Sequence, residues 1–154
     1  MLSGAFQPHG VSTAEADPIT HLPLRRETVE ATDLLFADGP TRAGMVAALA
    51  IGIDEFGEMW ERYGHTAGTA ILLTCADRLR TAVRDDDLIC RLDGPRMAVV
   101  LCSSAMADLE SLIQLSTRIQ KQMQEPISID GTRVFVSASV GFCAPGRSPA
   151  PVSY

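Results

Sequence analysis

The chain has 154 residues, 46% of them hydrophobic and 21% charged, and a formal net charge of −6 at pH 7. This length and composition indicate one globular domain that is large enough to bury a core without disulfides or metals. The acidic balance argues against a nucleic-acid surface, which would need a basic patch, and no apolar run reaches the roughly 18 residues of a membrane span.

The N-terminus and the cysteines indicate the compartment. The first ten residues lack the basic and apolar regions of a signal peptide. The cysteines stand singly among apolar neighbours, without metal-ligand or redox spacing, and are Cys75, Cys90, Cys102 and Cys143. They are interpreted as small buried side chains in a reducing environment. We expect a cytoplasmic segment with no bound metal or cofactor.

Residues 1–16 are small, polar and aperiodic, which predicts a flexible lead-in. A helix is predicted to open after Asp17, with Pro23 in its first turn, and to run to about Ala37. Its inward face is expected to carry the apolar side chains Leu24, Val29, Leu34 and Leu35.

An apolar run from Met45 to Ile53 predicts a central strand. Two helices are expected after it, on either side of a break at Gly64-His65, and the second should run from about Ala67 to Val83. Its apolar residues recur at helical spacing and are Ile71, Leu72, Cys75, Leu79 and Val83.

Residues 87–101 predict a β-hairpin. Asp93-Gly94 is the turn signal, because glycine tolerates the positive φ that tight turns require. The run from Met97 to Leu101 is apolar throughout and predicts a buried strand. Pro95 is placed at the start of that strand, since proline cannot donate to a ladder.

Residues 105–124 predict an amphipathic helix that Pro126 stops. Residues 127–132 predict a second turn-linked strand pair, whose return strand runs from Arg133 to Phe142. Residues 145–154 have the composition of a linker-like tail. The order of elements predicts an α/β domain with a mixed central β-sheet flanked by helices.

Four segments resemble motifs of the GGDEF domain, the diguanylate cyclase family. Residues 17–26 resemble D-x-L-T-G-L-x-N-R, residues 51–69 resemble I-D-x-D-x-F-K-x-I-N-D-x-x-G-H-x-x-G-D, and residues 133–142 resemble V-x-V-T-A-S-I-G. The predicted hairpin turn stands where the family has G-G-D/E-E-F, and here reads Asp93, Gly94, Pro95, Arg96 and Met97.

The resemblance spans residues 17–144 and implies a nucleotide-cyclase-like GGDEF fold. The family continues with a last helix that is not found here. Either the chain was cut before it, or a partner domain covers the sheet face that the helix would cover.

The resemblance also implies where a cyclase would hold its ligands. Mg²⁺ needs anionic oxygens, and phosphoryl transfer depends on charge neutralisation. The two metal positions fall on Gly52 and Pro95, and the neighbouring acid falls on Arg96. The positions for the phosphate-binding Lys and the guanine-reading Asn and Asp fall on Gly57, Trp60 and Thr69. We therefore expect no catalytic site.

Three other residues of this region have simple structural interpretations. Trp60 is expected to fill the base cavity by packing. Asp54 is interpreted as a helix N-cap, and His65 as a turn residue with satisfied hydrogen bonds rather than a catalytic base.

Arg84 and Asp87 stand in the register of the family's R-x-x-D site for cyclic di-GMP, with Arg91 as a helper. Arginine holds phosphate and guanine bidentately, and aspartate accepts hydrogen bonds from guanine. Two interpretations stay open. These residues form a ligand site, or Arg84 is a helix-end charge beside a solvated acidic loop.

The sequence therefore predicts a non-catalytic GGDEF domain of bacterial cyclic di-GMP signalling, acting as a regulatory or sensing module next to an EAL phosphodiesterase domain. The alternatives are an active diguanylate cyclase, a module that binds GTP without reacting, and a dimerisation scaffold. Expected partners are cyclic di-GMP, an EAL-type domain or another GGDEF domain, with neither nucleic acid nor membrane for this segment.

Overall fold

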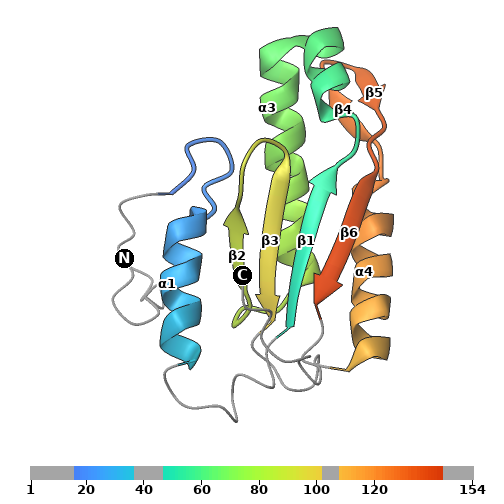
Figure 1. Cartoon of the computed structure of the whole chain (residues 1–154). Coiled ribbons are helices and arrows are strands. Elements are labelled where there is room, and N and C mark those ends of the chain that lie inside the picture. The colour runs from blue at the N-terminus through green and yellow to red at the C-terminus, as the bar shows by residue number, and fades with distance from the viewer. Residues whose placement is uncertain (1–15, 37–46, 102–107, 144–154) are drawn as a thin grey trace, which may run out of the picture.

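The computed structural model describes residues 16–36, 47–101 and 108–143 (Figure 1). The predicted tail, and all of the predicted lead-in except Ala16, lie outside these residues. The elements follow in the order α1 (Arg25–Phe36), β1 (Ala47–Ile53), α3 (Phe56–Ala82), β2 (Leu88–Arg91), β3 (Arg96–Leu101), α4 (Leu109–Met123), β4 (Ile127–Ile129), β5 (Thr132–Val134) and β6 (Ala138–Cys143).

The main sheet has four strands in the order β2-β3-β1-β6. The predicted α/β class is confirmed, but every neighbouring pair in this sheet is antiparallel, so the prediction of a mixed sheet is wrong in that detail. The reason is the position of the hairpin. The crossover through α3 brings β2 back in the same direction as β1, and β3 then inserts between the two strands.

The second predicted hairpin differs from its prediction as well. β4 and β5 pair as a separate two-stranded sheet, and the chain then leaves this sheet so that β6 pairs with β1. In Figure 1 the small sheet projects beyond the end of the main one. The backbone N–H of Asp54 donates to the carbonyl of Ser137 at 2.9 Å, which holds the link between β5 and β6 against the end of β1. The predicted single return strand is therefore two strands.

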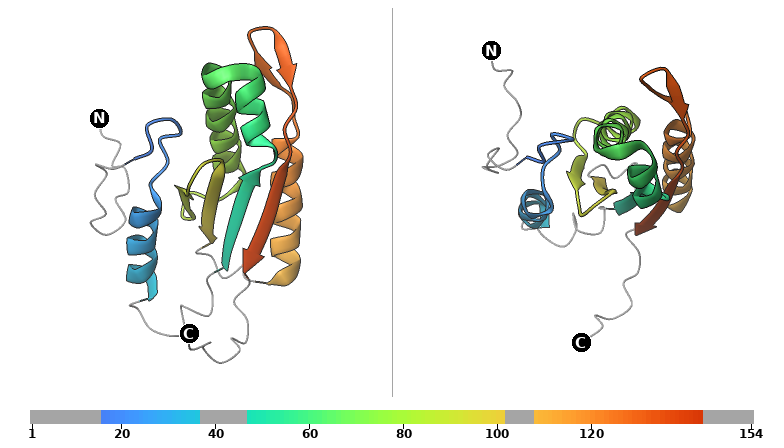
Figure 2. Two further views of the ribbon diagram at one scale, coloured as in Figure 1. Left: turned by 45° about the horizontal axis from the view of Figure 1, so that its top comes forward. Right: turned by 90° about the horizontal axis from the view of Figure 1, so that it is seen from above.

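The core lies between one face of the main sheet and the helices α3 and α4 (Figure 2). Alternate residues of β1 point into it: Ala47, Leu49, Ile51 and Ile53. From α3 the predicted apolar stripe meets them, with Ile71, Leu72, Cys75 and Leu79 all buried. Burial of each large aliphatic side chain stabilises the fold by about 1.5–3 kcal/mol. The helical spacing of the apolar residues thus predicted the inward face of α3, and the structure shows that β1 alternates between buried and more exposed residues.

The first helix begins later than predicted. Pro23 forms an isolated bridge with Ala16 and lies ahead of α1, which starts at Arg25. α1 contacts β2. Its residues Glu27 and Thr28 are buried, whereas the predicted inward residue Val29 is 47% exposed. The helix starts late because the turn before it, described below, holds the preceding residues out of helical geometry.

Gly64 breaks α3 as predicted. Its φ of 87° and ψ of 177° are non-helical, and helix continues on both sides of it. Because this φ lies in the region that glycine adopts at little cost, the kink needs a glycine at this position. In the described part of the chain, none of the helices is long and apolar enough to cross a membrane.

Candidate functional site

The end of β1 and the tip of the β2–β3 hairpin meet in the structure. Gly52 pairs with Arg96 across the two strands, and the N–H of Ile53 donates to the carbonyl of Pro95 at 3.3 Å. A Cβ atom on Gly52 would lie 3.9 Å from Cγ of Arg96. The three positions expected to have lost their metal-binding groups therefore lie together.

A basic side chain occupies the hairpin tip. The N–H of Arg96 donates to the carbonyl of Asp93 at 3.0 Å, so the centre of the turn is Gly94-Pro95, one residue later than predicted, with φ of 52° at Gly94. The Arg96 guanidinium lies 3.2 Å from the Asp93 carboxylate, and both side chains are exposed. Among the described residues, no cluster of three or more His, Cys, Asp or Glu side chains forms a metal site.

Trp60 packs against the kink of α3. A Cβ atom on Gly68 would lie 2.3 Å from a ring carbon of Trp60, which indicates how closely the indole lies on the helix backbone. The ring also contacts His65 edge-on, at 4.8 Å between centroids, and Phe56 at 5.6 Å. The hydroxyl of Thr69 donates to the His65 carbonyl at 2.9 Å. These side chains serve the local packing of α3.

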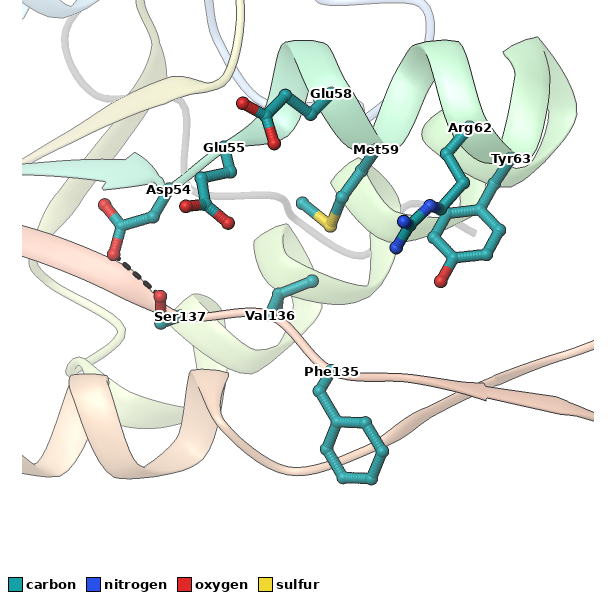
Figure 3. Close-up of a pocket in the computed structure, with 9 residues that line it drawn as sticks. All are labelled: Asp54, Glu55, Glu58, Met59, Arg62, Tyr63, Phe135, Val136 and Ser137. Carbon is teal, nitrogen blue, oxygen red and sulfur yellow. Dashed lines mark hydrogen bonds between the residues drawn. The ribbon is translucent and has the colours of Figure 1, made fainter.

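Asp54 does not cap α3, so that prediction is wrong. Glu55 is the N-cap residue, with φ of 53° and no side-chain capping bond. The Asp54 carboxylate instead accepts hydrogen bonds from the hydroxyl of Ser137 at 2.8 Å (Figure 3) and from the hydroxyl of Ser139 at 2.6 Å. Two residues, Asp54 and Glu55, separate the end of β1 from the start of α3. Asp54 therefore lies beside β6, and its carboxylate joins the end of β1 to Ser137 and Ser139.

Arg84 and Asp87 close the loop between α3 and β2. The backbone N–H of Arg84 donates to Oδ2 of Asp87, and the N–H of Asp87 donates to the Arg84 carbonyl, each at 3.0 Å. Asp87 is 9% exposed, whereas Arg84 is exposed. These two hydrogen bonds give Asp87 a structural role, since they close the loop, and the Arg84 side chain lies at the surface.

Arg91 lies at the other end of β2 from this loop. Its guanidinium donates to Oδ1 of Asp17 at 2.8 Å and to the carbonyl of Gly94 at 3.0 Å. The structure therefore brings Arg84 and Asp87 together, whereas Arg91 binds Asp17 and Gly94. The three-residue ligand set stays a prediction.

Sequence reasoning found the D-x-x-T motif at Asp17 and Thr20 but assigned it no role. Asp17 is 6% exposed and accepts bonds from the N–H and the hydroxyl of Thr20, each at 2.7 Å, as well as from Arg91. Burial alone raises the pKa of Asp17, but the bonds from Thr20 and the charge of Arg91 hold this pKa below its ordinary value of 3.8. The cluster fastens the turn before α1 to the hairpin.

These features define an α/β domain with the nucleotide-cyclase-like architecture that the resemblance implies. The family model described as "Diguanylate cyclase, GGDEF domain" matches residues 14–150. The chain belongs to the GGDEF domain family.

The relatives support the same conclusion. Diguanylate cyclase TpbB of Pseudomonas aeruginosa (strain UCBPP-PA14) is 33% identical over 129 residues, which are 83% of this chain and 29% of TpbB. Cyclic di-GMP phosphodiesterase NbdA of P. aeruginosa is 32% identical over 96 residues, 62% of this chain and 12% of NbdA. The solved structure of a TpbB mutant comprising only the GGDEF domain has a TM-score of 0.77 and 32% identity, and the match covers 83% of this chain and 74% of that one. The chain thus spans less than a third of either curated relative.

Proposed function

We propose that this chain is a non-catalytic GGDEF domain that acts as a regulatory module in cyclic di-GMP signalling. The observation that carries the proposal is the pairing of Gly52 with Arg96 at the hairpin tip. The resemblance assigns a metal ligand to the position of Gly52 and the acid beside the second metal ligand to the position of Arg96. The residues present there offer a hydrogen atom and a fixed positive charge. A divalent cation needs carboxylate oxygens and is repelled by a guanidinium.

The packing of Trp60 supports the same proposal. Its indole lies against Gly68, inside the kink next to Thr69. A guanine base that approached these positions would have to displace an aromatic side chain that already has three contact partners. On this proposal the domain lacks both the ligands for the metal ion that accompanies GTP and the space for the guanine base.

A measurement of metal-dependent GTP binding tests the proposal. Calorimetry with GTP and Mg²⁺ or Mn²⁺ is expected to give no saturable binding, with or without the metal. The double variant Gly52→Asp/Pro95→Glu should not restore binding, because Arg96, Gly57 and Trp60 remain. Saturable, metal-dependent GTP binding by the unmodified chain would contradict the proposal and favour an active cyclase or a module that binds GTP without reacting.

In the full-length protein we place the domain in the cytoplasm, next to an EAL phosphodiesterase domain. The similarity to NbdA, a cyclic di-GMP phosphodiesterase, supports this arrangement. A domain that makes no cyclic di-GMP still influences a neighbouring enzyme through its conformation or through a bound ligand. A sequence of the full-length protein without an EAL-type motif would contradict this part of the proposal.

The sensing form of the proposal assigns cyclic di-GMP to Arg84 and Asp87. Exposure of Arg84 next to the acidic group of Asp87 favours it. For Arg91 to help, its guanidinium would have to leave Asp17 and Gly94. Binding in the micromolar range corresponds to about −8 kcal/mol.

A titration with cyclic di-GMP separates a sensor from a dimerisation scaffold. Arg84→Ala should weaken binding by about 2 kcal/mol or more. Arg84→Lys should bind almost as weakly, because the point charge of an ammonium group cannot reproduce the planar, bidentate geometry of a guanidinium. Asp85→Ala and Asp86→Ala are the matched controls, because both side chains are exposed and neither belongs to the predicted pair. Absence of saturable binding by the intact chain would favour the scaffold.

A further inference from the structure

A separate pocket of about 260 Å³ lies between the first two turns of α3 and the link from β5 to β6 (Figure 3). None of the residues compared above with the family's substrate positions lines it. The lining residues are Asp54, Glu55, Glu58, Met59, Arg62, Tyr63, Phe135, Val136 and Ser137. This pocket is therefore a cavity that neither the GGDEF resemblance nor the proposed function uses.

The pocket is charged but not uniformly acidic. Three carboxylates line it, from Asp54, Glu55 and Glu58, and one guanidinium, from Arg62. The hydroxyls of Ser137 and Ser139 hold both oxygens of Asp54 in place, at 2.8 and 2.6 Å. Each carboxylate oxygen keeps a further lone pair for another donor. The pocket thus has a fixed anionic group and an excess of negative charge.

The positive group lies apart from the negative ones. Arg62 stands six residues after Phe56, the first residue of α3, which is a helical rise of about 9 Å, and four residues after Glu58. Glu and Arg at i and i+4 commonly pair on a helix, yet no ion pair joins Glu58 and Arg62 within the described residues. In Figure 3 the carboxylates lie toward one end, Arg62 and Tyr63 toward the other, and Met59 and Val136 between them.

We propose that this pocket binds a small amphoteric molecule, with a cationic group and a carboxylate at the two ends of a short apolar chain. A basic amino acid belongs to this class and carries a further ammonium group beside its carboxylate. Its side-chain cation would meet Asp54 and Glu55, its methylene groups would lie on Met59 and Val136, and its carboxylate would pair with Arg62 in the bidentate geometry that guanidinium favours. Its net charge of about +1 at neutral pH complements the acidic excess of the pocket. The proposal does not rest on the loss of catalysis.

Calorimetry on the whole chain with three probes tests this assignment. L-arginine should bind saturably at one site per chain. Agmatine lacks the carboxylate but carries one more net positive charge, and it should bind at least tenfold more weakly. L-norleucine lacks the side-chain cation and should show no binding at the same concentrations. Attraction by bulk charge alone predicts the opposite order, with agmatine the tightest, and that result would overturn the proposal.

Substitutions of exposed residues locate the site without disturbing the core. Glu55→Gln and Arg62→Gln should each weaken L-arginine binding at least tenfold. Glu61→Gln and Arg133→Gln make the same charge changes outside the pocket and should leave this binding unchanged. Arg62→Gln is the sharper variant, because it makes the pocket more acidic and would strengthen binding if only charge attracted the ligand. Undetectable binding of both L-arginine and L-lysine to the unmodified chain, or equal losses in the control variants, would contradict the proposal.

Discussion

Two aspartate–arginine pairs lie on either side of the hairpin tip, and they differ in burial. In the Asp17–Arg91 pair the side chains are 8% and 14% exposed and the atoms lie 2.8 Å apart. In the Asp93–Arg96 pair they are 76% and 62% exposed and lie 3.2 Å apart. The first pair joins the turn before α1 to β2, and the second lies across the hairpin tip, on either side of Gly94 and Pro95. The buried pair therefore fastens two segments of the fold to each other, while the exposed pair contacts water.

Removal of the buried aspartate should have the largest effect. Asp17→Asn leaves Arg91 buried without its counter-ion and weakens the bonds from Thr20, so the free energy of unfolding should fall by about 3–5 kcal/mol. Urea denaturation followed by circular dichroism measures this loss. A loss below about 1 kcal/mol would mean that the turn before α1 contributes little to the domain.

The contact between Trp60 and Gly68 should give the next largest effect. In Gly68→Ala the new methyl group would collide with the indole, and the free energy of unfolding should fall by about 1–3 kcal/mol although alanine is the better helix former. Gly57→Ala is the control, since nothing lies within 4 Å of its Cβ position. The double variant Trp60→Ala/Gly68→Ala should lose less than the sum of the two single variants. Strict additivity would show that the two residues do not interact.

The pH dependence of stability sharpens the contrast between the two pairs. Because the pKa of Asp17 is lowered in the folded chain, folding favours the ionised carboxylate. The stabilisation is complete above the ordinary pKa of 3.8 and is lost as the pH falls through the lower folded value. The difference in unfolding free energy between the unmodified chain and Asp17→Asn should stay constant from about pH 7 to pH 5 and shrink below about pH 4. A difference that grows as the pH falls would contradict this sign.

The exposed pair should give the smallest effect. Asp93→Asn disturbs an ion pair that water and salt screen, so the free energy of unfolding should change by less than about 1 kcal/mol. The change should also become smaller in high salt. If Asp93→Asn lowers the free energy of unfolding as much as Asp17→Asn does, burial does not determine how much each ion pair stabilises the fold.

Hydrophobic patterns predicted most of the fold. The strand β1, the apolar stripe of α3 and the break at Gly64 all appear where the sequence indicated. The predictions failed where long-range partners decide the structure. The pairing of β6 with β1, rather than with β4, depends on contacts more than 80 residues apart in the chain, such as Ser139 with Asp54.

The candidate site was predictable in part. The resemblance assigned Gly52 and Arg96 to one pocket, and these residues pair across β1 and β3, but the roles of the site residues stay predictions. The partner of Arg91 was not predictable from local spacing, because Asp17 lies 74 residues away. The pocket beside Asp54 was missed for the same reason, since its walls come from α3 and from the link that precedes β6.

A direct assay of product tests the central claim that the chain does not catalyse the cyclase reaction. The purified chain is incubated with GTP and Mg²⁺ or Mn²⁺ at high protein concentration, so that two domains can meet, and cyclic di-GMP is measured by chromatography. We expect no cyclic di-GMP above the level of a protein-free control. Cyclic di-GMP that accumulates in proportion to the unmodified chain would contradict the account.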